Sequence, residues 1–112
     1  MLKYIFSFII LIHGLIHFMG FAKAFGYGNI TQLGEVSKPM GSLWLITAFL
    51  FIAVTILFLL KKDAWALTGI VAAILSQLLI ITVWKDAKFG TIANLIILIT
   101  AISISLNLFK LK

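Results

Sequence analysis

The sequence predicts an all-α membrane protein in which residues 1–112 form one domain, an antiparallel four-transmembrane-helix bundle. Two observations predict this fold. Hydrophobic residues make up 63% of the 112 residues and charged residues only 11%, whereas a soluble domain needs roughly 25% charged residues to cover its surface. The apolar residues are also gathered into four long runs. This composition excludes a soluble globular fold, a disordered chain and a nucleic-acid-binding protein.

Each apolar run has the length of a membrane-spanning helix. A helix rises about 1.5 Å per residue, so it needs ~20 residues to cross a hydrocarbon core of ~30 Å. The runs are apolar on nearly all sides, whereas strands of a membrane barrel would be shorter and would alternate polar with apolar residues. The predicted spans are residues 4–22, 41–60, 64–84 and 91–109.

The first span carries His13 and His17, which are separated by four positions. Residues four apart lie on one face of a helix, so both imidazoles point the same way. Ionisable side chains inside a span are costly and usually face the bundle interior, so the pair predicts a site. Three interpretations are open. The imidazoles hydrogen-bond to neighbouring helices or to a ligand, they bind a metal with a further ligand such as Glu35 or Asp86, or they bind haem in a dimer.

The first connection, about residues 23–40, is the longest. It holds three of the eight glycines, the single proline and the single glutamate. Pro39, just before Gly41, is well placed to start the second span. We expect this loop to be either a lid or contact surface or a plain connector. The other connections, residues 61–63 and 85–90, are tight turns that make neighbouring helices antiparallel.

Polar residues of the later spans fall at the depth of the histidines. In an antiparallel arrangement, His17 shares one half of the membrane with the start of the second span, the end of the third and the start of the fourth. Trp44, Gln77 and Asn94 lie in that half. We therefore expect a polar pocket lined by His13, His17, Gln77 and Asn94, with Trp44 at its rim and the long loop as its roof.

The third span also carries a face of small residues. Gly69 and Ala73 are four residues apart, and so are Ala72 and Ser76. This spacing lets helices approach closely in a membrane. We expect these four residues to serve internal packing or homodimerisation.

The nine lysines are scattered near the ends of the spans, where they can contact the headgroups of membrane lipids. Cytoplasmic segments of membrane proteins are enriched in lysine. One side has five lysines (Lys3, Lys61, Lys62, Lys110 and Lys112), and the other has four (Lys23, Lys38, Lys85 and Lys88). We therefore expect a multi-pass protein with both termini in the cytoplasm.

Three stretches of the chain, GLIHFMGFAKAFG (14–26), SKPMGSLWL (37–45) and LSQLLIITVWKDAKFGTIANLIIL (75–98), resemble a group of small uncharacterised bacterial four-helix membrane proteins that is broadly similar to the DoxX-like superfamily. The resemblance implies a four-helix bundle in the bacterial inner membrane. It also implies a partnership with other membrane or redox proteins, and contact between the pocket and a quinone or lipid. It places no catalytic residue on this chain.

The expected function is that of an accessory or binding protein for a quinone, a lipid or another small amphiphile, rather than an enzyme. One alternative is a metal- or haem-binding redox subunit that uses His13 and His17. Another is a structural protein that docks on a second copy or a larger membrane complex through Gly69 and Ala73. The sequence defines no cofactor. The chain has no cysteine, which excludes disulfides, thiolate catalysis and cysteine-ligated metals.

Overall fold

The computed structural model of the chain describes residues 1–31 and 33–111, with side chains up to residue 107. The side chains of residues 108–109, at the end of the predicted fourth span, lie outside this description, and so do those of Lys110 and Lys112, which enter the lysine count. The described residues form helices and no strand. The helices are α1 (Leu2–Ile16), α2 (Phe18–Phe25), α3 (Lys38–Leu59), α4 (Ala64–Thr82), α5 (Trp84–Ala87) and α6 (Gly90–Leu111).

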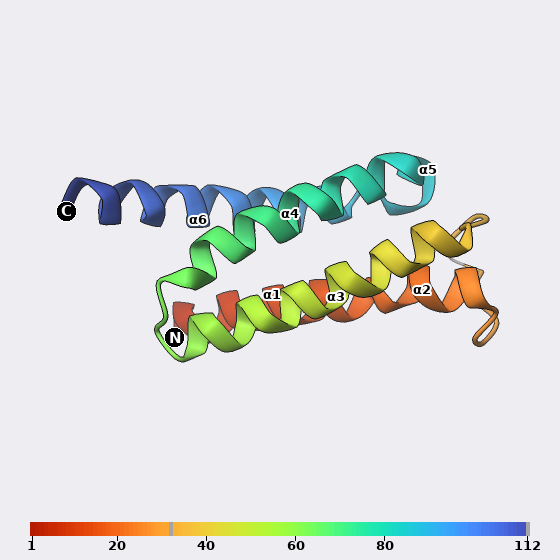
Figure 1. Ribbon diagram of the computed structural model, residues 1–112, viewed down its shortest axis with the longest axis horizontal. Helices are drawn as coiled ribbons and strands as arrows, with labels where there is room; N and C mark the ends of the chain where they lie inside the picture. The colour runs from red at the N-terminus through yellow and green to blue at the C-terminus, as the bar shows by residue number, and fades with distance from the viewer. Residues whose placement is uncertain (32, 112) are drawn as a thin grey trace.

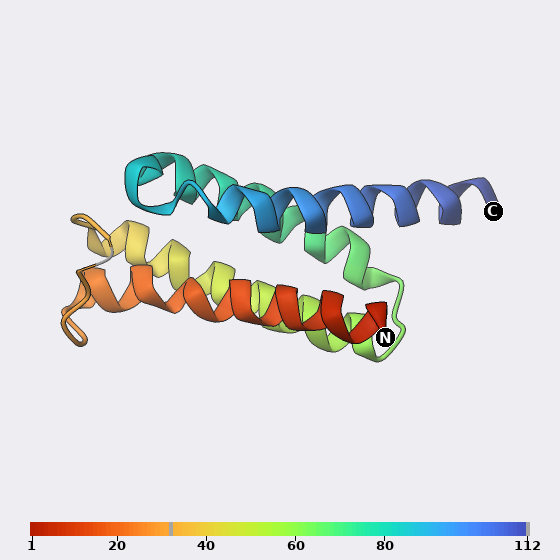
Figure 2. The same ribbon diagram turned by 180° about the vertical axis from the view of Figure 1, so that it is seen from behind.

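The long helices lie along one axis of an elongated molecule that measures 47 × 23 × 22 Å (Figure 1). The chain runs out through α1 and α2, returns through α3, runs out through α4 and returns through α6. As a result α1 begins and α6 ends at the same end of the molecule, while α5 and the long loop lie at the other end (Figure 1). Seen from behind, α1 and α6 both lie on the face toward the viewer (Figure 2).

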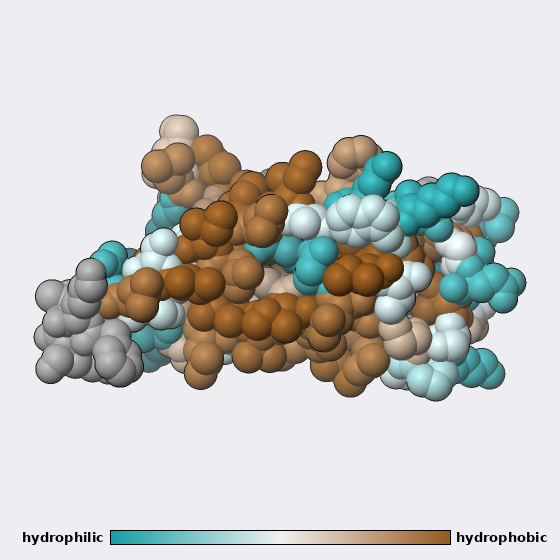
Figure 3. All heavy atoms as spheres, turned by 90° about the horizontal axis from the view of Figure 1, so that it is seen from above, coloured by the Kyte–Doolittle hydropathy of each residue, from teal (hydrophilic) through white to brown (hydrophobic). Residues whose placement is uncertain are grey.

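The outer surface of the molecule is apolar over most of its length. Large apolar side chains such as Ile46, Phe49 and Ile99 are exposed. On the face shown in Figure 3, apolar residues cover most of the middle, and hydrophilic residues gather mainly toward the end that carries α5 and the long loop. Such a surface indicates a multi-pass membrane protein. Four helical segments are long and apolar enough to cross a membrane by length and composition: Leu2–Phe25, Lys38–Leu59, Ala64–Thr82 and Gly90–Asn107.

The first predicted span is interrupted at His17, where α1 gives way to α2. The backbone N–H of His17 donates to the carbonyl oxygen of Gly14, three residues back, at 3.0 Å. The carbonyl oxygen of His13, which a regular helix would pair with that N–H, accepts instead from His17 Nδ1 at 2.7 Å. The imidazole thus replaces the backbone donor at this carbonyl, and the helix tightens locally.

The long loop is shorter than the sequence indicates, because both of its ends are helical. Residues 23–25 belong to α2, and α3 begins at Lys38. The Oγ of Ser37 caps α3 by accepting from the backbone N–H of Met40 at 3.4 Å, and Pro39 lies in the first turn, where its missing N–H costs nothing. Pro39 therefore starts the second long helix as expected. The last connection is not a plain turn, because it contains α5.

The helices pack closely in sequence order and loosely across one seam. α1 and α2 pack on α3, α3 packs on α4, and α4 packs on α6, but α1 and α6 make few contacts. The approach of α3 depends on glycine. A Cβ atom at Gly14 would lie 2.6 Å from Cβ of Phe51, and one at Gly20 would overlap the ring of Trp44. The close α1–α3 packing and the loose α1–α6 seam together set the position of the site.

The small-residue face of α4 is buried inside the chain. All four of its residues, Gly69, Ala72, Ala73 and Ser76, are buried. A Cβ atom at Gly69 would lie 3.6 Å from Val54 of α3 and 3.7 Å from Ile97 of α6. The face therefore packs against neighbouring helices of the same chain, which is the internal role that the spacing allows.

Candidate functional site

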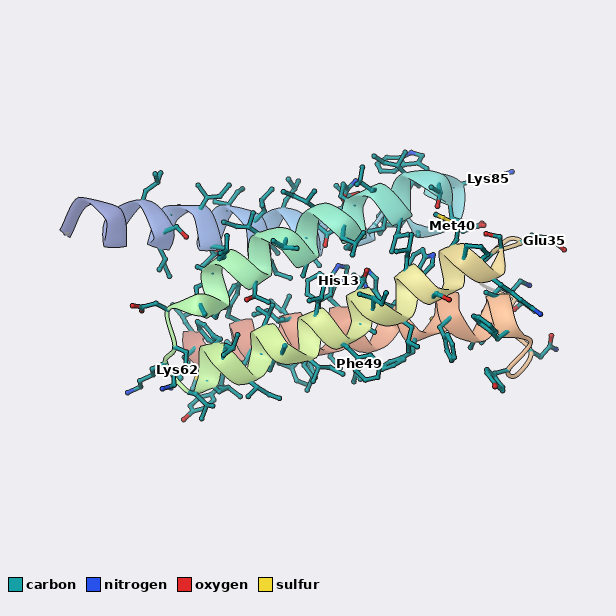
Figure 4. The ribbon with its side chains drawn as sticks, in the orientation of Figure 1. His13, Glu35, Met40, Phe49, Lys62 and Lys85 are labelled. Atoms are coloured by element: carbon teal, nitrogen blue, oxygen red, sulfur yellow. The ribbon has the colours of Figure 1, made fainter. Side chains whose placement is uncertain are left out.

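The two histidines lie side by side in the interior, where Figure 4 shows His13 pointing between the helices. Both side chains are buried. Their ring centroids are 4.8 Å apart and the rings are nearly perpendicular. The ring of Phe51 on α3 packs against both imidazoles, at 5.0 Å from His13 and 5.2 Å from His17. The predicted common face of the pair is therefore the inner face of α1.

A network of hydrogen bonds joins the imidazoles to α4 and α6. His17 Nε2 lies 2.7 Å from Ser76 Oγ on α4. His13 Nε2 lies 2.7 Å from Asn94 Oδ1 on α6. Asn94 Nδ2 donates to Ser76 Oγ at 3.0 Å and closes the network. Three helices are thus connected at one buried point.

The backbone carbonyl of His13 determines where the protons of this network lie. A carbonyl only accepts, so His17 Nδ1 donates to it, and Nε2 of the neutral ring accepts from the Ser76 hydroxyl. Asn94 Nδ2 donates to both Ser76 Oγ and Gln77 Oε1, so Asn94 Oδ1 accepts from His13 Nε2. The two imidazoles are therefore opposite tautomers. His13 Nδ1 is an acceptor without a hydrogen-bond partner among the described residues.

A cavity of about 490 Å³ lies beside the histidines, in the loosely packed seam between α1 and α6. Its polar lining residues are His13, His17, Trp44 and Asp86. The rest of the lining is apolar: Phe8, Ile9, Ile12, Ile16, Met19, Leu33, Ile80, Ala87, Phe89, Gly90 and Ala93.

Three of the five residues predicted to form the pocket line this cavity, and two do not. His13, His17 and Trp44 are in its lining. Asn94 stands behind His13 as its hydrogen-bond partner. Asn94 and Gln77 line a separate hollow of about 350 Å³ formed by α4 and α6. Gln77 follows Ser76 in α4, and consecutive residues of a helix point about 100° apart, so only one of the two can face the histidines.

Gln77 extends the polar network within α4 and α6. Its Oε1 accepts from Asn94 Nδ2 at 3.0 Å, and its Nε2 donates to Thr91 Oγ1 at 3.0 Å. The amide of Gln77 thus ties the start of α6 to α4 and helps to hold Asn94 in one orientation. Its role is positional, because no atom of Gln77 lines the cavity beside the histidines.

Trp44 lies deeper than the rim position that the sequence suggests. Its side chain is only 3% exposed, and its ring centroid lies 5.1 Å from that of His17. Gly20 makes this depth possible, because it has no Cβ to block the indole. Trp44 Nε1 is the one buried side-chain nitrogen or oxygen atom in the described part of the chain that has no hydrogen-bond partner. Such buried donors are normally paired, so this N–H is an unused donor on a side chain that lines the cavity.

The long loop closes one end of the cavity, where the sequence predicts a roof. Leu33 is buried and contributes to the lining. Next to it, the backbone N–H of Gly34 donates to Asp86 Oδ2 of α5 at 2.9 Å. Lys23 Nζ also donates to the carbonyl oxygen of Ile30 at 2.8 Å. These bonds hold the loop against α5 and α2.

Fewer atoms are free to bind a metal ion than the sequence suggests. Across residues 1–31 and 33–107, no group of three or more His, Cys, Asp or Glu side chains is placed to hold a metal ion. Both ring nitrogens of His17 already have protein partners. Asp86 borders the cavity, but one of its oxygens accepts from Gly34. The side-chain nitrogen and oxygen atoms of His13, His17 and Asp86 without a hydrogen-bond partner among the described residues are His13 Nδ1 and the second oxygen of Asp86.

Sequence reasoning missed three contributors to the site. Ser76 was assigned to the small-residue face, yet it lies at the centre of the network. Its depth, one residue from Gln77, was the available signal. Thr91, at the start of α6, and Leu33, in the loop, carry no pattern that marks them.

Comparison of the chain with protein-family models, with curated protein sequences and with solved structures finds no match. The resemblance to DoxX-like proteins therefore stays a prediction. The features of the chain that bear on function are the cavity, the unpaired nitrogens of His13 and Trp44, and the hydrogen-bond network behind them.

Proposed function

We propose that this protein is an antiparallel four-helix bundle of the bacterial inner membrane that binds a small amphiphile, such as a quinone or a lipid, in the cavity between α1 and α6. Its termini face the cytoplasm, and its role is that of a binding or accessory protein. The observation that carries the proposal is the cavity itself, which has apolar walls and is also lined by His13 and Trp44, two side chains that each have one nitrogen without a hydrogen-bond partner.

The size and lining of the cavity suit an apolar molecule with a polar head. Small-molecule sites measure roughly 300–1,000 Å³ and combine apolar walls with a few placed polar groups. The cavity of about 490 Å³ falls in this range. Its walls can enclose a hydrocarbon segment, while His13 and Trp44 offer an acceptor and a donor to the head.

The cavity reaches the outer surface of the bundle sideways. Phe8 of α1 and Phe89, just before α6, both line it, yet they are 64% and 75% exposed. In a membrane these rings face the lipid chains. A ligand dissolved in the bilayer can therefore enter between α1 and α6 without crossing the polar loop. This route favours a ligand taken from the membrane over one taken from water.

The geometry supports binding more than metal or haem chemistry. A metal on His17 would have to displace Ser76 or the carbonyl of His13, and both hydrogen bonds measure 2.7 Å. The other polar groups of the cavity are the indole of Trp44 and the carboxylate of Asp86, and that carboxylate already accepts from Gly34. A bound amphiphile needs none of these bonds to break.

Trp44 can report binding, because it lines the cavity. We would compare two double variants: W65F/W84F keeps only Trp44, and W44F/W65F keeps only Trp84, which is 49% exposed. Each is reconstituted in nanodiscs with increasing amounts of an amphiphile that has a brominated chain and quenches tryptophan on contact. Binding predicts that Trp44 is quenched saturably at low mole fractions, at which Trp84 is still bright.

A matched pair of substitutions on α6 tests whether the quencher occupies the cavity. Ala93→Phe fills the cavity, and we expect it to remove the saturable phase. Ile99→Phe adds the same ring to the exposed face of the same helix, and we expect it to change nothing. The proposal is wrong if Trp44 quenching only rises in parallel with that of Trp84 and ignores Ala93→Phe.

A further inference from the structure

We infer that the ligand of this cavity has an uncharged head that bears a hydroxyl group. The inference rests on the proposed function and specifies the chemistry of its ligand. It follows from two unpaired nitrogens, Trp44 Nε1 and His13 Nδ1, and from the negative charge of Asp86 in the cavity lining.

The first atom is a donor. Trp44 Nε1 is buried without a partner, and an indole N–H can only donate. A ligand that occupies the cavity and offers no acceptor would leave this donor unpaired, at a cost in affinity. The head must therefore contain an oxygen or another acceptor.

The second atom is an acceptor. His13 Nε2 gives its proton to Asn94 Oδ1, so Nδ1 carries the lone pair. Asn94 cannot turn over to reverse this assignment, because the Ser76 hydroxyl gives its proton to His17 Nε2 and therefore has to accept from the amide nitrogen of Asn94. The head must therefore also contain a donor. A hydroxyl group is the smallest uncharged group that both donates and accepts.

The two unpaired atoms belong to His13 and Trp44, whose rings both pack against the imidazole of His17. The imidazole of His17 lies 4.8 Å from that of His13 and 5.1 Å from the indole of Trp44, measured between ring centroids. Both nitrogens of His17 are used within the protein. A head group that rests against His17 thus lies between the side chain that holds the unpaired donor and the side chain that holds the unpaired acceptor.

A charged head group cannot pair with both the Trp44 donor and the His13 acceptor. A phosphate, sulfonate or carboxylate has no proton for His13 Nδ1, and the one charged residue of the lining, Asp86, is itself negative. A quaternary ammonium has neither the donor nor the acceptor. Burying an anion in apolar walls also costs solvation energy without a compensating partner. Long-chain alcohols, acylglycerols and hydroquinones share the chemistry that fits.

The test is a series of photoreactive probes that share one diazirine-bearing alkyl chain and differ only in the head. The heads are an alcohol, its methyl ether, the plain alkane, a sulfonate and a trimethylammonium group. The full-length protein is labelled in nanodiscs at equal probe fractions. The labelled peptides of α1 and α6 are quantified by mass spectrometry, and labelling in the Ala93→Phe variant is subtracted.

We expect the alcohol to label the seam about fivefold more than the ether, and the ether about fivefold more than the alkane, because each step removes one hydrogen bond. Both charged probes should label no better than the alkane. Trp44→Phe keeps an aromatic ring and removes the N–H, so it should reduce ether labelling to the level of the alkane in the same variant.

The outcomes separate this inference from the proposed function. Equal labelling by alcohol, ether and alkane, or strongest labelling by a charged probe, would overturn the hydroxyl inference and leave amphiphile binding intact. If no probe labels the wild-type seam above the Ala93→Phe level, both the inference and the proposed function fail. The wild-type series decides the matter even if Trp44→Phe does not fold.

Discussion

At the scale of single residues, one carbonyl oxygen organises the site. In a regular helix the carbonyl of His13 would pair with the backbone of His17, but here it pairs with the His17 side chain. That bond breaks the helix, sets the tautomer of His17 and makes Ser76 a donor. Ser76 in turn accepts from Asn94 Nδ2, so Asn94 Oδ1 accepts from His13 Nε2. This series of hydrogen bonds leaves Nδ1 of His13, a residue of the cavity lining, as an acceptor without a partner.

The opposite tautomers of the two histidines can be observed directly. We expect His17 to carry its proton on Nδ1 and His13 on Nε2, because the first donates to a carbonyl and the second to an amide oxygen. Long-range ¹H–¹⁵N correlation NMR of histidine-labelled protein in nanodiscs distinguishes the two forms. Two histidines in the same tautomer would contradict the hydrogen-bond assignment.

Ser76→Ala tests the cost of breaking the network. The substitution fits the space but leaves His17 Nε2 and Asn94 Nδ2 short of a buried partner. We expect the free energy of unfolding to fall by about 1–3 kcal/mol, measured by titration with a denaturing detergent. Ser42→Ala is the control, because Ser42 is exposed and bonds only within its own helix. An equal effect of the two substitutions would show that the network adds nothing to stability.

At the scale of helices, glycine decides which pairs approach closely. A Cβ atom at Gly14 would clash with Phe51, whereas one at Gly69 would meet its neighbours at ordinary contact distances of 3.6 to 3.8 Å. The tight α1–α3 contact holds Phe51 against both imidazoles. The small-residue face of α4 has room for a Cβ atom at Gly69. Its four-residue spacing is nevertheless easier to recognise in the sequence than the role of Gly14.

Two substitutions to alanine compare these contacts. We expect Gly14→Ala to destabilise the fold by about 1–3 kcal/mol, because α3 must shift to make room. Gly69→Ala should be close to neutral, since alanine has the higher helix propensity and there is space for it. The same detergent titration measures both. A larger loss of unfolding free energy for Gly69→Ala than for Gly14→Ala would contradict the close packing of α1 on α3.

The sequence predicts the helices well and the site only in part, for physical reasons that these residues illustrate. Composition and run length depend on each segment alone, so four apolar helices follow from them. The break at His17 depends on a ring that bonds its own backbone, and the burial of Trp44 depends on the space left by Gly20. Whether Ser76 or Gln77 faces the histidines depends on the rotation of α4, which no pattern within α4 specifies.

At the scale of the whole molecule, the two ends of the bundle carry lysines that predict its orientation. Figure 4 shows Lys62 at one end, and Glu35 and Lys85 at the other. Because the chain has no cysteine, a single introduced cysteine can be labelled without background. We expect an impermeant maleimide to label Lys85→Cys in intact cells and to label Lys62→Cys only after lysis. The reverse pattern would place the termini outside.

The central claim is that the seam between α1 and α6 holds an amphiphile, and native mass spectrometry of the protein released from its own membrane tests it most directly. The wild type and Ile99→Phe should each retain one small amphiphile per chain, and Ala93→Phe should lose it, because Ala93 lines the cavity and Ile99 does not. A wild-type protein without any retained mass, or the same retained mass in all three proteins, would contradict the claim.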